Sequence, residues 1–522
     1  MSAGAAGGPR VGYSVADLIR KGGSGGRPDA EALFFEGRRV SFGELDSRSD
    51  RVAAGLRARG FAKGERAAIL AHNSVEFVET YFALAKLGGV VVPVNYLLRA
   101  AEVDYALRDS GATWLFADGS GLDVVAEILG DHPELNVVGL EAGASGAIPY
   151  EDLLRCADPA PEAGEVQPED LLLLQYTSGT TGFPKGAMHT HSTVLFNALH
   201  QIADFGLSAD DVYVLQPALC WAAGINNIAL ALWSLGGRVV MRPSRGFDAE
   251  ELAGAIATEG GTVLIGVASV LRLLVESGTF TRHDLSRLRL IAVGGEAVAP
   301  ALLEKAREQL PQTEIGQVYG QTEFPTLMAF LGAERALEKP ASTGRATSLC
   351  ELKVVDPEGA ELPPGEHGEI ICRSPASMKG YWNKPEQTAE TIVNGWLRTG
   401  DRGYTDEEGF LYIAGRSKEM YISGGLNVYP AEAEVVLAEH PEVAEVAVKG
   451  IADERFGEVG CAYLVPAGEG LDLAAVEAFC RERLASYKVP KRWVVRDQPL
   501  PRTASGKAEK HRLELPLETA GP

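Results

Sequence analysis

The stretch Leu171–Tyr176 contains four leucines followed by Gln and Tyr, and it ends at a loop rich in Gly and Thr. A short, nearly continuous apolar run is typical of a strand buried on both faces of a parallel sheet. Comparable runs recur at Arg66–Ala71, Val90–Val94, Thr262–Val267 and Leu290–Val293. Amphipathic segments such as Val75–Lys86 alternate with these runs and are predicted to be helices. The pattern predicts an α/β fold of layered sheets covered by helices.

The sequence changes character near residue 350, where short predicted strands are separated by Pro/Gly turns. We interpret 345–415 as a small β-barrel-like unit at the end of a large N-terminal domain, 13–415. A second boundary lies close to residue 416, because β/α alternation resumes beyond it. The segment 420–522 is long enough for a separate small α+β domain. Residues 1–12 are rich in Gly and Ala and are expected to be disordered.

Charge and cysteine content exclude several classes of protein. The formal net charge is −22, whereas a sequence-independent nucleic-acid binder is expected to carry basic clusters. The six cysteines are scattered and form no CxxC pair, which favours reduced thiols in the cytoplasm over a zinc site or a disulfide framework. The start lacks the apolar core of a signal peptide, and no apolar run reaches the ~18 residues of a membrane span.

The loop after Leu171–Tyr176 carries the strongest local signal. It reads Thr177, Ser178, Gly179, Thr180, Thr181, Gly182, Phe183, Pro184, Lys185, Gly186. Glycines allow backbone N–H groups to converge on an anion, hydroxyls add donors, and the lysine adds a positive charge. The composition therefore predicts phosphate binding, although the Walker pattern G-x-x-x-x-G-K-[ST] cannot be matched here.

This loop resembles the phosphate loop of the adenylate-forming superfamily, which includes acyl-CoA synthetases, nonribosomal adenylation domains and firefly luciferase. Further matching segments extend the resemblance over nearly the whole chain, from 42–45 through 87–95 and 109–112 to 506–507. The resemblance implies an ATP-dependent ligase that first adenylates a carboxylic acid and then transfers the acyl group to a thiol. It also implies that ATP and coenzyme A are co-substrates and that Mg²⁺ is a cofactor.

The same resemblance assigns nucleotide-binding roles to several segments. In Tyr319-Gly320-Gln321-Thr322-Glu323, the tyrosine would stack on adenine, while Thr322 and Glu323 would serve the phosphate and the metal. Thr177 and Glu323 are the predicted Mg²⁺ ligands, in keeping with the preference of Mg²⁺ for oxygen. Asp401 would accept hydrogen bonds from the ribose hydroxyls, because a carboxylate offers two acceptor oxygens. The remaining predicted nucleotide contacts are Gly294, Gly295, Glu296 and Arg416.

The end of the chain matches the family's mobile lid domain. Lys507 corresponds to its catalytic lysine, which would stabilise the charge that develops at the α-phosphate. Lys418 falls within the hinge, 416–419, about which this domain would rotate. Gly424 and Gly425 would let a pantetheine arm pass close to the backbone. Lys491 and Arg492 are the predicted landing site for the remainder of coenzyme A.

The segment that would close over the acyl group supplies most candidate pocket residues. These candidates are Cys220, Trp221, Ile225, Asn226, Asn227, Thr326, Leu327 and Met328. Their mixture favours an apolar or aromatic acid, with the asparagines available to read a ring substituent. No Asp occurs between Tyr213 and Gly246, which weakens the case for an α-amino acid substrate.

Three functional alternatives stay open at this point. The first is an acyl- or aryl-CoA ligase, and the second is an adenylating enzyme that delivers its acyl group to a carrier protein or an amine. The third is a nucleotide-binding protein without turnover. The sequence determines neither the acid nor an oligomeric state, and a homodimer is one alternative.

Overall fold

The structure is a computed structural model of the 522-residue chain. It describes residues 13–24, 26–141, 146–156, 165–177, 184–295, 298, 300–336, 338–416, 419–423, 426–453, 455–468, 470–484, 486–502 and 508–515. The predicted disorder of residues 1–12 lies outside this part of the chain. Among the described residues, no helix is long and apolar enough to cross a membrane.

The first of two large sheets has seven strands in the order β7-β6-β5-β3-β4-β8-β9. Its strands are β3 (Arg66–Leu70), β4 (Val90–Val94), β5 (Trp114–Ala117), β6 (Asn136–Gly139), β7 (Ile148–Pro149), β8 (Leu171–Tyr176) and β9 (Gly186–Thr190). All neighbouring strands are parallel except β8 and β9, which form an antiparallel pair. The predicted phosphate loop therefore connects the two strands of a hairpin.

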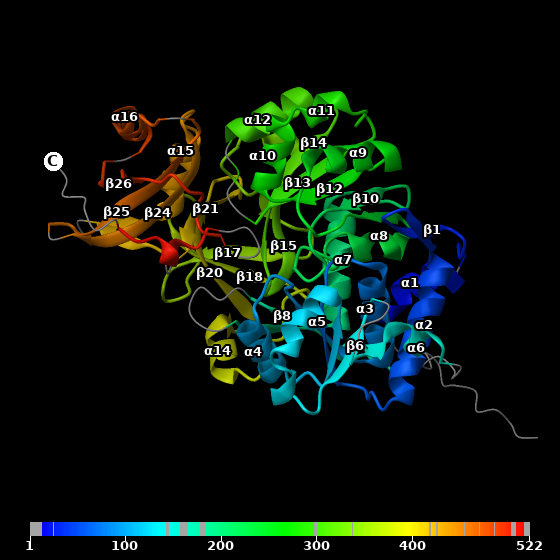
Figure 1. Cartoon of the computed structure of the whole chain (residues 1–522). Helices are drawn as coiled ribbons and strands as arrows, with labels where there is room; N and C mark the ends of the chain where they lie inside the picture. The colour runs from blue at the N-terminus through cyan, green and yellow to red at the C-terminus, as the bar shows by residue number, and fades with distance from the viewer. Residues whose placement is uncertain are drawn as a thin grey trace, which may run out of the picture.

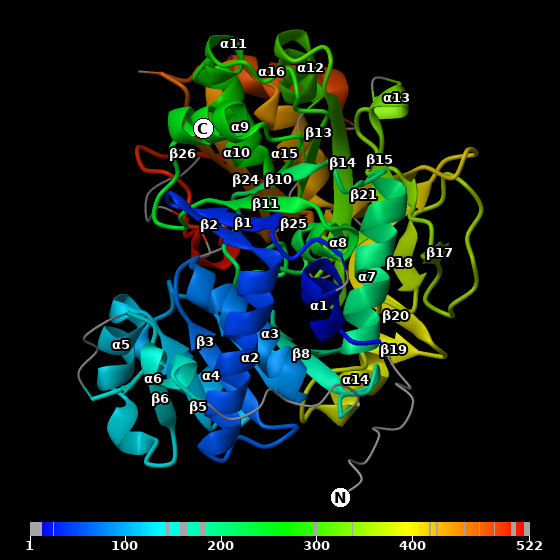
Figure 2. The same cartoon turned by 90° about the vertical axis from the view of Figure 1, so that its right-hand side faces the viewer.

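Helices α2 (Phe42–Ala58) and α3 (Val75–Leu87) lie side by side against the first sheet (Figure 2). Helix α3 begins after Ser74, whose side chain accepts a hydrogen bond from the backbone N–H of Phe77. It ends at Gly88, which adopts a φ of 65°, a left-handed conformation that favours glycine. The remaining helices near this sheet are α4 (Ala100–Ser110), α5 (Gly119–Ala126) and α6 (Tyr150–Leu154).

The second large sheet has nine strands in the order β16-β15-β14-β13-β12-β10-β11-β1-β2. They are β1 (Glu31–Phe35), β2 (Arg38–Ser41), β10 (Val212–Leu215), β11 (Arg238–Met241), β12 (Val263–Gly266), β13 (Leu290–Gly294), β14 (Glu314–Gln321), β15 (Phe324–Leu331) and β16 (Arg345–Ala346). Its centre is parallel, and β2, β15 and β16 pair antiparallel at the two edges. The associated helices are α1 (Ala16–Ser24), α7 (His191–Asp204), α8 (Ala229–Leu235), α9 (Ala249–Glu259), α10 (Ala268–Glu276), α11 (Thr279–Arg282), α12 (Pro300–Gln309) and α13 (Ala333–Ala336).

The largest hydrophobic core joins the two sheets. It contains buried residues from β3 and β8 of the first sheet, from β10 and β13 of the second, and from α3, α7 and α8. Burial of this much apolar surface is the main favourable contribution to folding. The expected fold class, layered sheets with helices packed on them, is confirmed.

A smaller antiparallel sheet occupies the region where short strands were expected. It contains β17 (Glu351–Val355), β18 (Gly368–Arg373), β19 (Ile392–Val393), β20 (Trp396–Thr405) and β21 (Leu411–Arg416). Helix α14 (Pro385–Thr391) lies beside α4 (Figure 1), where Lys384 forms a 2.7 Å ion pair with Asp109. This contact ties the small sheet to the first large sheet.

The C-terminal segment forms a unit with its own core, shown in orange and red in Figure 1. Its strands are β22 (Tyr421–Ser423), β23 (Leu426–Val428), β24 (Val443–Asp453), β25 (Gly457–Pro466) and β26 (Arg492–Val495), with helices α15 (Pro430–Ala438) and α16 (Leu473–Arg483). Strand β24 pairs antiparallel with β25, which pairs parallel with β26. This arrangement agrees with the small α+β domain expected from the sequence.

Candidate active site

The β8–β9 hairpin holds the two ends of the predicted phosphate loop together. The backbone N–H of Thr177 donates to the carbonyl of Lys185 at 3.0 Å, which continues the pairing of the two strands. Ser178, Gly179, Thr180, Thr181 and Gly182 lie outside the described residues. The Nζ of Lys185 lies 4.9 Å from the ring centroid of Tyr381, within the range of a cation–π contact.

The predicted adenine and metal segment spans the turn between β14 and β15, with Tyr319, Gly320 and Gln321 at the end of β14. The main-chain carbonyl of Thr322 lies 2.9 Å from Nε2 of His189 on strand β9. A carbonyl can only accept, so the imidazole must carry its proton on Nε2. His189 therefore connects the phosphate-loop hairpin to the residue that precedes Glu323.

Glu323 is held from the small β subdomain. Its Oε1 accepts a 2.7 Å hydrogen bond from the Tyr381 hydroxyl, and its main-chain carbonyl accepts one from the backbone of Met378 at 2.8 Å. Tyr381 also forms a β-bridge with Ala187 of strand β9. One tyrosine thus contacts the predicted metal ligand, the phosphate-loop lysine and the loop's second strand.

Tyr319, Asp401 and Arg416 meet although they come from β14, β20 and β21. The Tyr319 hydroxyl donates to Oδ2 of Asp401 at 2.6 Å, and Nε of Arg416 lies 3.4 Å from its Oδ1. Asp401 and Arg416 are also register partners in the β20–β21 ladder. Burial, reinforced by the Asp401 carboxylate, raises the pKa of Tyr319 well above its usual value, so the hydroxyl remains a donor. The carboxylate is therefore fixed in orientation from two sides.

The predicted glycines Gly294 and Gly295 lie at the end of β13. A Cβ on Gly294 would come within 2.5 Å of the Val318 side chain, so close packing of β13 on β14 requires glycine there. Gly295 has a φ of 84°, which also favours glycine. Glu296 lies outside the described residues.

The structure divides the predicted acyl-pocket residues into two groups. Ile225, Cys220 and Leu327 are buried in the largest core, and Trp221 packs against them while staying partly exposed. Met328 faces the other side of β15, in the cluster that contains Tyr319. The prediction that Met328 lines the same pocket as Leu327 is therefore not supported, because their side chains lie on opposite faces of β15. Thr326 lies in β15, but its side chain is outside the described part.

Polar contacts anchor the segment that carries Cys220 and Asn226. Gln175 Nε2 donates to the Cys220 carbonyl at 2.9 Å, and Tyr81 donates to Oδ1 of Asn226 at 2.9 Å. Asn227 is buried in the adjacent turn. Burial raises the pKa of the Cys220 thiol to about 12, so this cysteine remains protonated and is not a nucleophile at neutral pH.

The predicted coenzyme A contacts are only partly described. Nζ of Lys491 lies 4.0 Å from the ring centroid of Phe456, and Arg492 begins β26 with an exposed side chain. Gly424, Gly425, Lys418 and Lys507 lie outside the described residues. Their predicted roles stay predictions.

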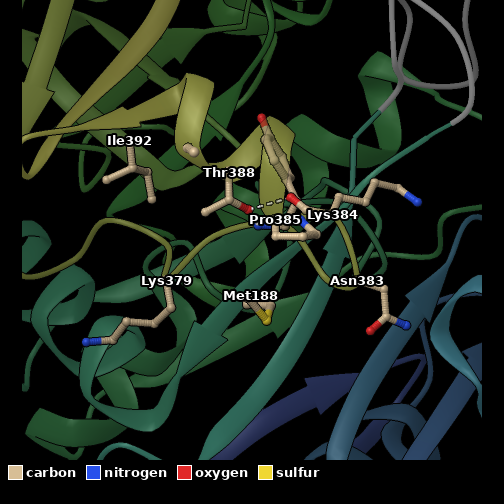
Figure 3. A pocket seen from close by; sticks show the side chains of 9 residues that line it. Met188, Lys379, Asn383, Lys384, Pro385, Thr388 and Ile392 are labelled. Carbon is tan, nitrogen blue, oxygen red and sulfur yellow. Dashed lines mark hydrogen bonds between the residues drawn. The ribbon is translucent and has the colours of Figure 1, made fainter.

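A surface pocket of about 530 Å³ lies beside strand β9, with Met188, Pro385 and Ile392 among its lining residues (Figure 3). Its two lysines are engaged in ion pairs, Lys379 with Glu169 and Lys384 with Asp109. The pocket therefore offers no unpaired lysine for a phosphate.

Sequence reasoning missed His189 and Tyr381, which bring the candidate residues together. His189 is itself buried in β9, next to buried Thr190, and resembles an ordinary core position. Tyr381 follows Glu323 by 58 residues, and nothing in a single sequence pairs the two. The Gly-Tyr-Trp run at 380–382 is the one local signal that could have drawn attention to it.

Acidification is expected to destabilise the protein through His189 and His191. Burial lowers the pKa of each imidazole from its usual 6.5 to about 4. Between these values the unfolded chain binds more protons than the folded one, so stability decreases as the pH falls. From pH 7.5 to pH 5 we expect a loss of about 2 kcal/mol per histidine in the free energy of unfolding.

Urea unfolding at pH 7.5, 6 and 5 measures this effect. His189→Gln keeps an N–H donor for Thr322 but removes one titrating group, so its loss between pH 7.5 and 5 should be smaller. Equal pH dependence in the wild type and the variant would contradict the assignment to His189.

Comparison with known proteins finds family models that match most of the chain. A family model described as AMP-binding enzyme matches residues 24–382, and one described as AMP-binding enzyme C-terminal domain matches 432–507. The chain belongs to the AMP-binding enzyme family. The resemblance inferred from the motifs is therefore confirmed.

Individual relatives of this AMP-binding enzyme cover nearly its whole length. Indoleacetate–CoA ligase from Aromatoleum aromaticum is 38% identical, covering 93% of this chain and 95% of the relative. Feruloyl-CoA synthase from Amycolatopsis is 37% identical, covering 92% and 94%. The structure of o-succinylbenzoate CoA synthetase from Bacillus subtilis with the acyl-adenylate intermediate OSB-AMP has a TM-score of 0.85 at 33% identity, covering 96% of this chain and 98% of that one. The predicted reaction class, an AMP-forming acid–thiol ligase that uses ATP, is confirmed.

Proposed function

We propose that this AMP-binding enzyme joins an aromatic carboxylic acid to coenzyme A, with cleavage of ATP to AMP and pyrophosphate. The observation that carries the proposal is the convergence of Tyr319, Asp401 and Arg416 from three different strands. The relatives named for indoleacetate and feruloyl groups support an aromatic acid. The partly exposed Trp221 beside buried Ile225 and Leu327 provides an apolar wall of suitable chemistry.

The nucleotide would bind between the β8–β9 hairpin and the end of β14. Asp401 would accept hydrogen bonds from the ribose hydroxyls, with its orientation fixed by Tyr319 and Arg416. The adenine would stack on Tyr319, and Lys185 with the loop 177–182 would hold the phosphates. The main-chain groups of 294–296 would complete the nucleotide site.

Glu323 and Thr177 have the chemistry that Mg²⁺ requires. The Glu323 carboxylate is partly exposed and held by Tyr381, while Thr177 lies at the base of the phosphate loop. No cluster of three or more His, Cys, Asp or Glu residues suited to a metal occurs in the described ranges. Mg²⁺ commonly binds through one or two carboxylates plus substrate phosphates, so these residues fit it. When bound, the ion would neutralise charge on the phosphates.

The reaction consists of two displacements. A carboxylate oxygen of the acid attacks the α-phosphorus of ATP, and the bond to pyrophosphate breaks, which gives an acyl-adenylate. The thiolate sulfur of coenzyme A then attacks the acyl carbon, and the bond from this carbon to AMP breaks. Lys507 would stabilise the first transition state by its charge.

One cleft must serve both displacements, so we propose that the C-terminal unit rotates about 416–419 between them. Lys507 would face the cleft in the first step. Gly424 and Gly425 would line the thiol channel in the second, with Lys491 and Arg492 nearer the nucleotide part of coenzyme A. We also propose a cytoplasmic location, which the six free cysteines support.

Pyrophosphate release across a panel of benzoic, cinnamic, arylacetic, fatty and amino acids, with and without coenzyme A, tests the proposal. We expect multiple turnovers with aromatic acids only when coenzyme A is present. A requirement for an acyl carrier protein or an amine instead would overturn coenzyme A as the acceptor. No ATP consumption with any acid would overturn the ligase assignment.

A further inference from the structure

Buried side-chain amides hold the segment that is proposed to cover the acyl group. Gln175 of β8 donates from Nε2 to the Cys220 carbonyl at 2.9 Å. Asn197 of α7 donates from Nδ2 to the Asn226 carbonyl at 2.8 Å. Gln175 lies two residues before Thr177, where the phosphate loop begins. The two carbonyl acceptors, Cys220 and Asn226, are six residues apart in the segment.

These contacts determine which way each amide faces. A carbonyl can only accept, so the NH₂ group must point to the main chain and the amide oxygen must point away from it. The oxygens of both side chains are buried and have no hydrogen-bond partner in the described part of the chain. Asn197 itself is fully buried. A buried acceptor without a donor is costly, and it normally indicates an absent ligand or water.

The turn next to Asn197 is fixed in an unusual conformation. Ile228 has a φ of 61°, which is rare for a β-branched residue. Gln201 holds this turn: its Oε1 accepts from the Ile228 backbone at 2.6 Å, and its Nε2 donates to the Asn226 carbonyl at 3.3 Å. Strained backbone held by its surroundings is concentrated at binding sites. The position of the Asn197 amide is therefore preorganised by Gln201 and Asn226.

The protein offers no donor to this oxygen from the neighbouring candidate residues. The Trp221 N–H is also buried and without a partner among the described residues, so the two do not bond each other. The Asn226 side chain accepts from the Tyr81 hydroxyl through Oδ1, and its amide N–H groups make no hydrogen bond to Asn197 Oδ1 in the described part of the chain. The ligand that completes the site must therefore bring an N–H or O–H group.

We propose that Oδ1 of Asn197 accepts a hydrogen bond from the ring of the acid substrate, so that the enzyme selects aromatic acids bearing a ring N–H or O–H. This inference rests on the proposed function, because it concerns the acyl pocket of that ligase. An acid that lacks the donor leaves a buried acceptor unpaired, and such sites discriminate strongly against it. Asn197 is thus a specificity-determining residue.

Two pairs of nearly isosteric acids test the proposal. One compares 4-hydroxycinnamate with 4-methylcinnamate, and the other compares indole-3-acetate with benzothiophene-3-acetate. For at least one pair we expect kcat/KM for CoA-dependent pyrophosphate release to favour the donor-bearing acid by at least about tenfold. A ratio near one in both pairs would overturn the proposal and indicate that water occupies the site.

Variants then test whether Asn197 causes the preference for the donor-bearing acid. Asn197→Leu should reduce the ratio to near one, mainly by losing activity with the donor-bearing acid. Gln201→Met removes an amide that contacts the same turn, so it should affect both acids of a pair equally. A retained preference in Asn197→Leu would overturn the assignment.

Asn197→Asp covers the case in which the leucine variant fails to fold. A neutral Asp can donate its O–H to the Asn226 carbonyl and keep an acceptor oxygen, so it should preserve the preference; a lost preference in the folded protein would count against the proposal. Absence of CoA-dependent turnover with every acid would instead refute the proposed function. Equal turnover within both pairs refutes only the present inference.

Discussion

Lys507→Ala is expected to reduce acyl-adenylate formation by about 10²–10³-fold, the typical cost of removing a group that stabilises transition-state charge. Residues on either side of the segment that contains Lys507 are in contact: Arg502 forms a β-bridge with Ala508, and the Glu509 N–H donates to the Pro501 carbonyl at 2.7 Å. The match to the C-terminal family model ends at this lysine. Thiolysis of a supplied acyl-adenylate should change by no more than a few fold, because the lysine acts in the first displacement.

Both half-reactions can be measured separately, by pyrophosphate release and by acyl-CoA formation from synthetic adenylate. Arg512→Ala is a matched control, because Arg512 is an exposed cation that pairs with Glu509 on the same segment. It should leave both rates within about twofold of wild type, since exposed ion pairs contribute little. Equal losses in both half-reactions for Lys507→Ala would contradict the proposed role.

The bounds of a strand could be predicted from the sequence where the whole strand is one apolar run. The prediction for Leu171–Tyr176 reproduces β8, because an apolar run buried on both faces ends where the polar loop begins. Within β25, the apolar run Cys461–Val465 predicts only the second half of the strand, which starts at Gly457. Its first residues pair with the end of β24 through backbone hydrogen bonds, including Ala452 with Glu458. Such pairing leaves no hydrophobic pattern in the sequence.

Candidate site residues could be predicted where a short contiguous segment contains all the residue types that one ligand requires. The loop at 177–186 and the run at 319–323 combine residue types that suit phosphate and Mg²⁺ within a few positions. The links between segments could not be predicted, because His189 and Tyr381 act through contacts across strands. Asn197 was also missed, since a single amide on a helix becomes informative only when its hydrogen-bond partners are known.

Glu323→Gln is expected to lower the rate of adenylation by about 10²-fold, because it removes the negative charge of the predicted Mg²⁺ ligand while preserving its shape. The glutamine can still accept the hydrogen bond from Tyr381, so the turn between β14 and β15 should stay in place. The variant should also require more Mg²⁺ for half-maximal activity. Pyrophosphate release measured over a Mg²⁺ titration gives both quantities.

Tyr381→Phe separates positioning from direct participation. It keeps the ring beneath Lys185 but removes the 2.7 Å hydrogen bond to Glu323, a loss of about 1 kcal/mol that should slow adenylation about 3- to 10-fold. Because the hydroxyl acts through the Glu323 carboxylate, combining Tyr381→Phe with Glu323→Gln should add less than the product of the two single effects. Full multiplication of the effects would show that Tyr381 acts independently of Glu323. Unchanged Mg²⁺ dependence in Glu323→Gln would remove Glu323 from the metal site.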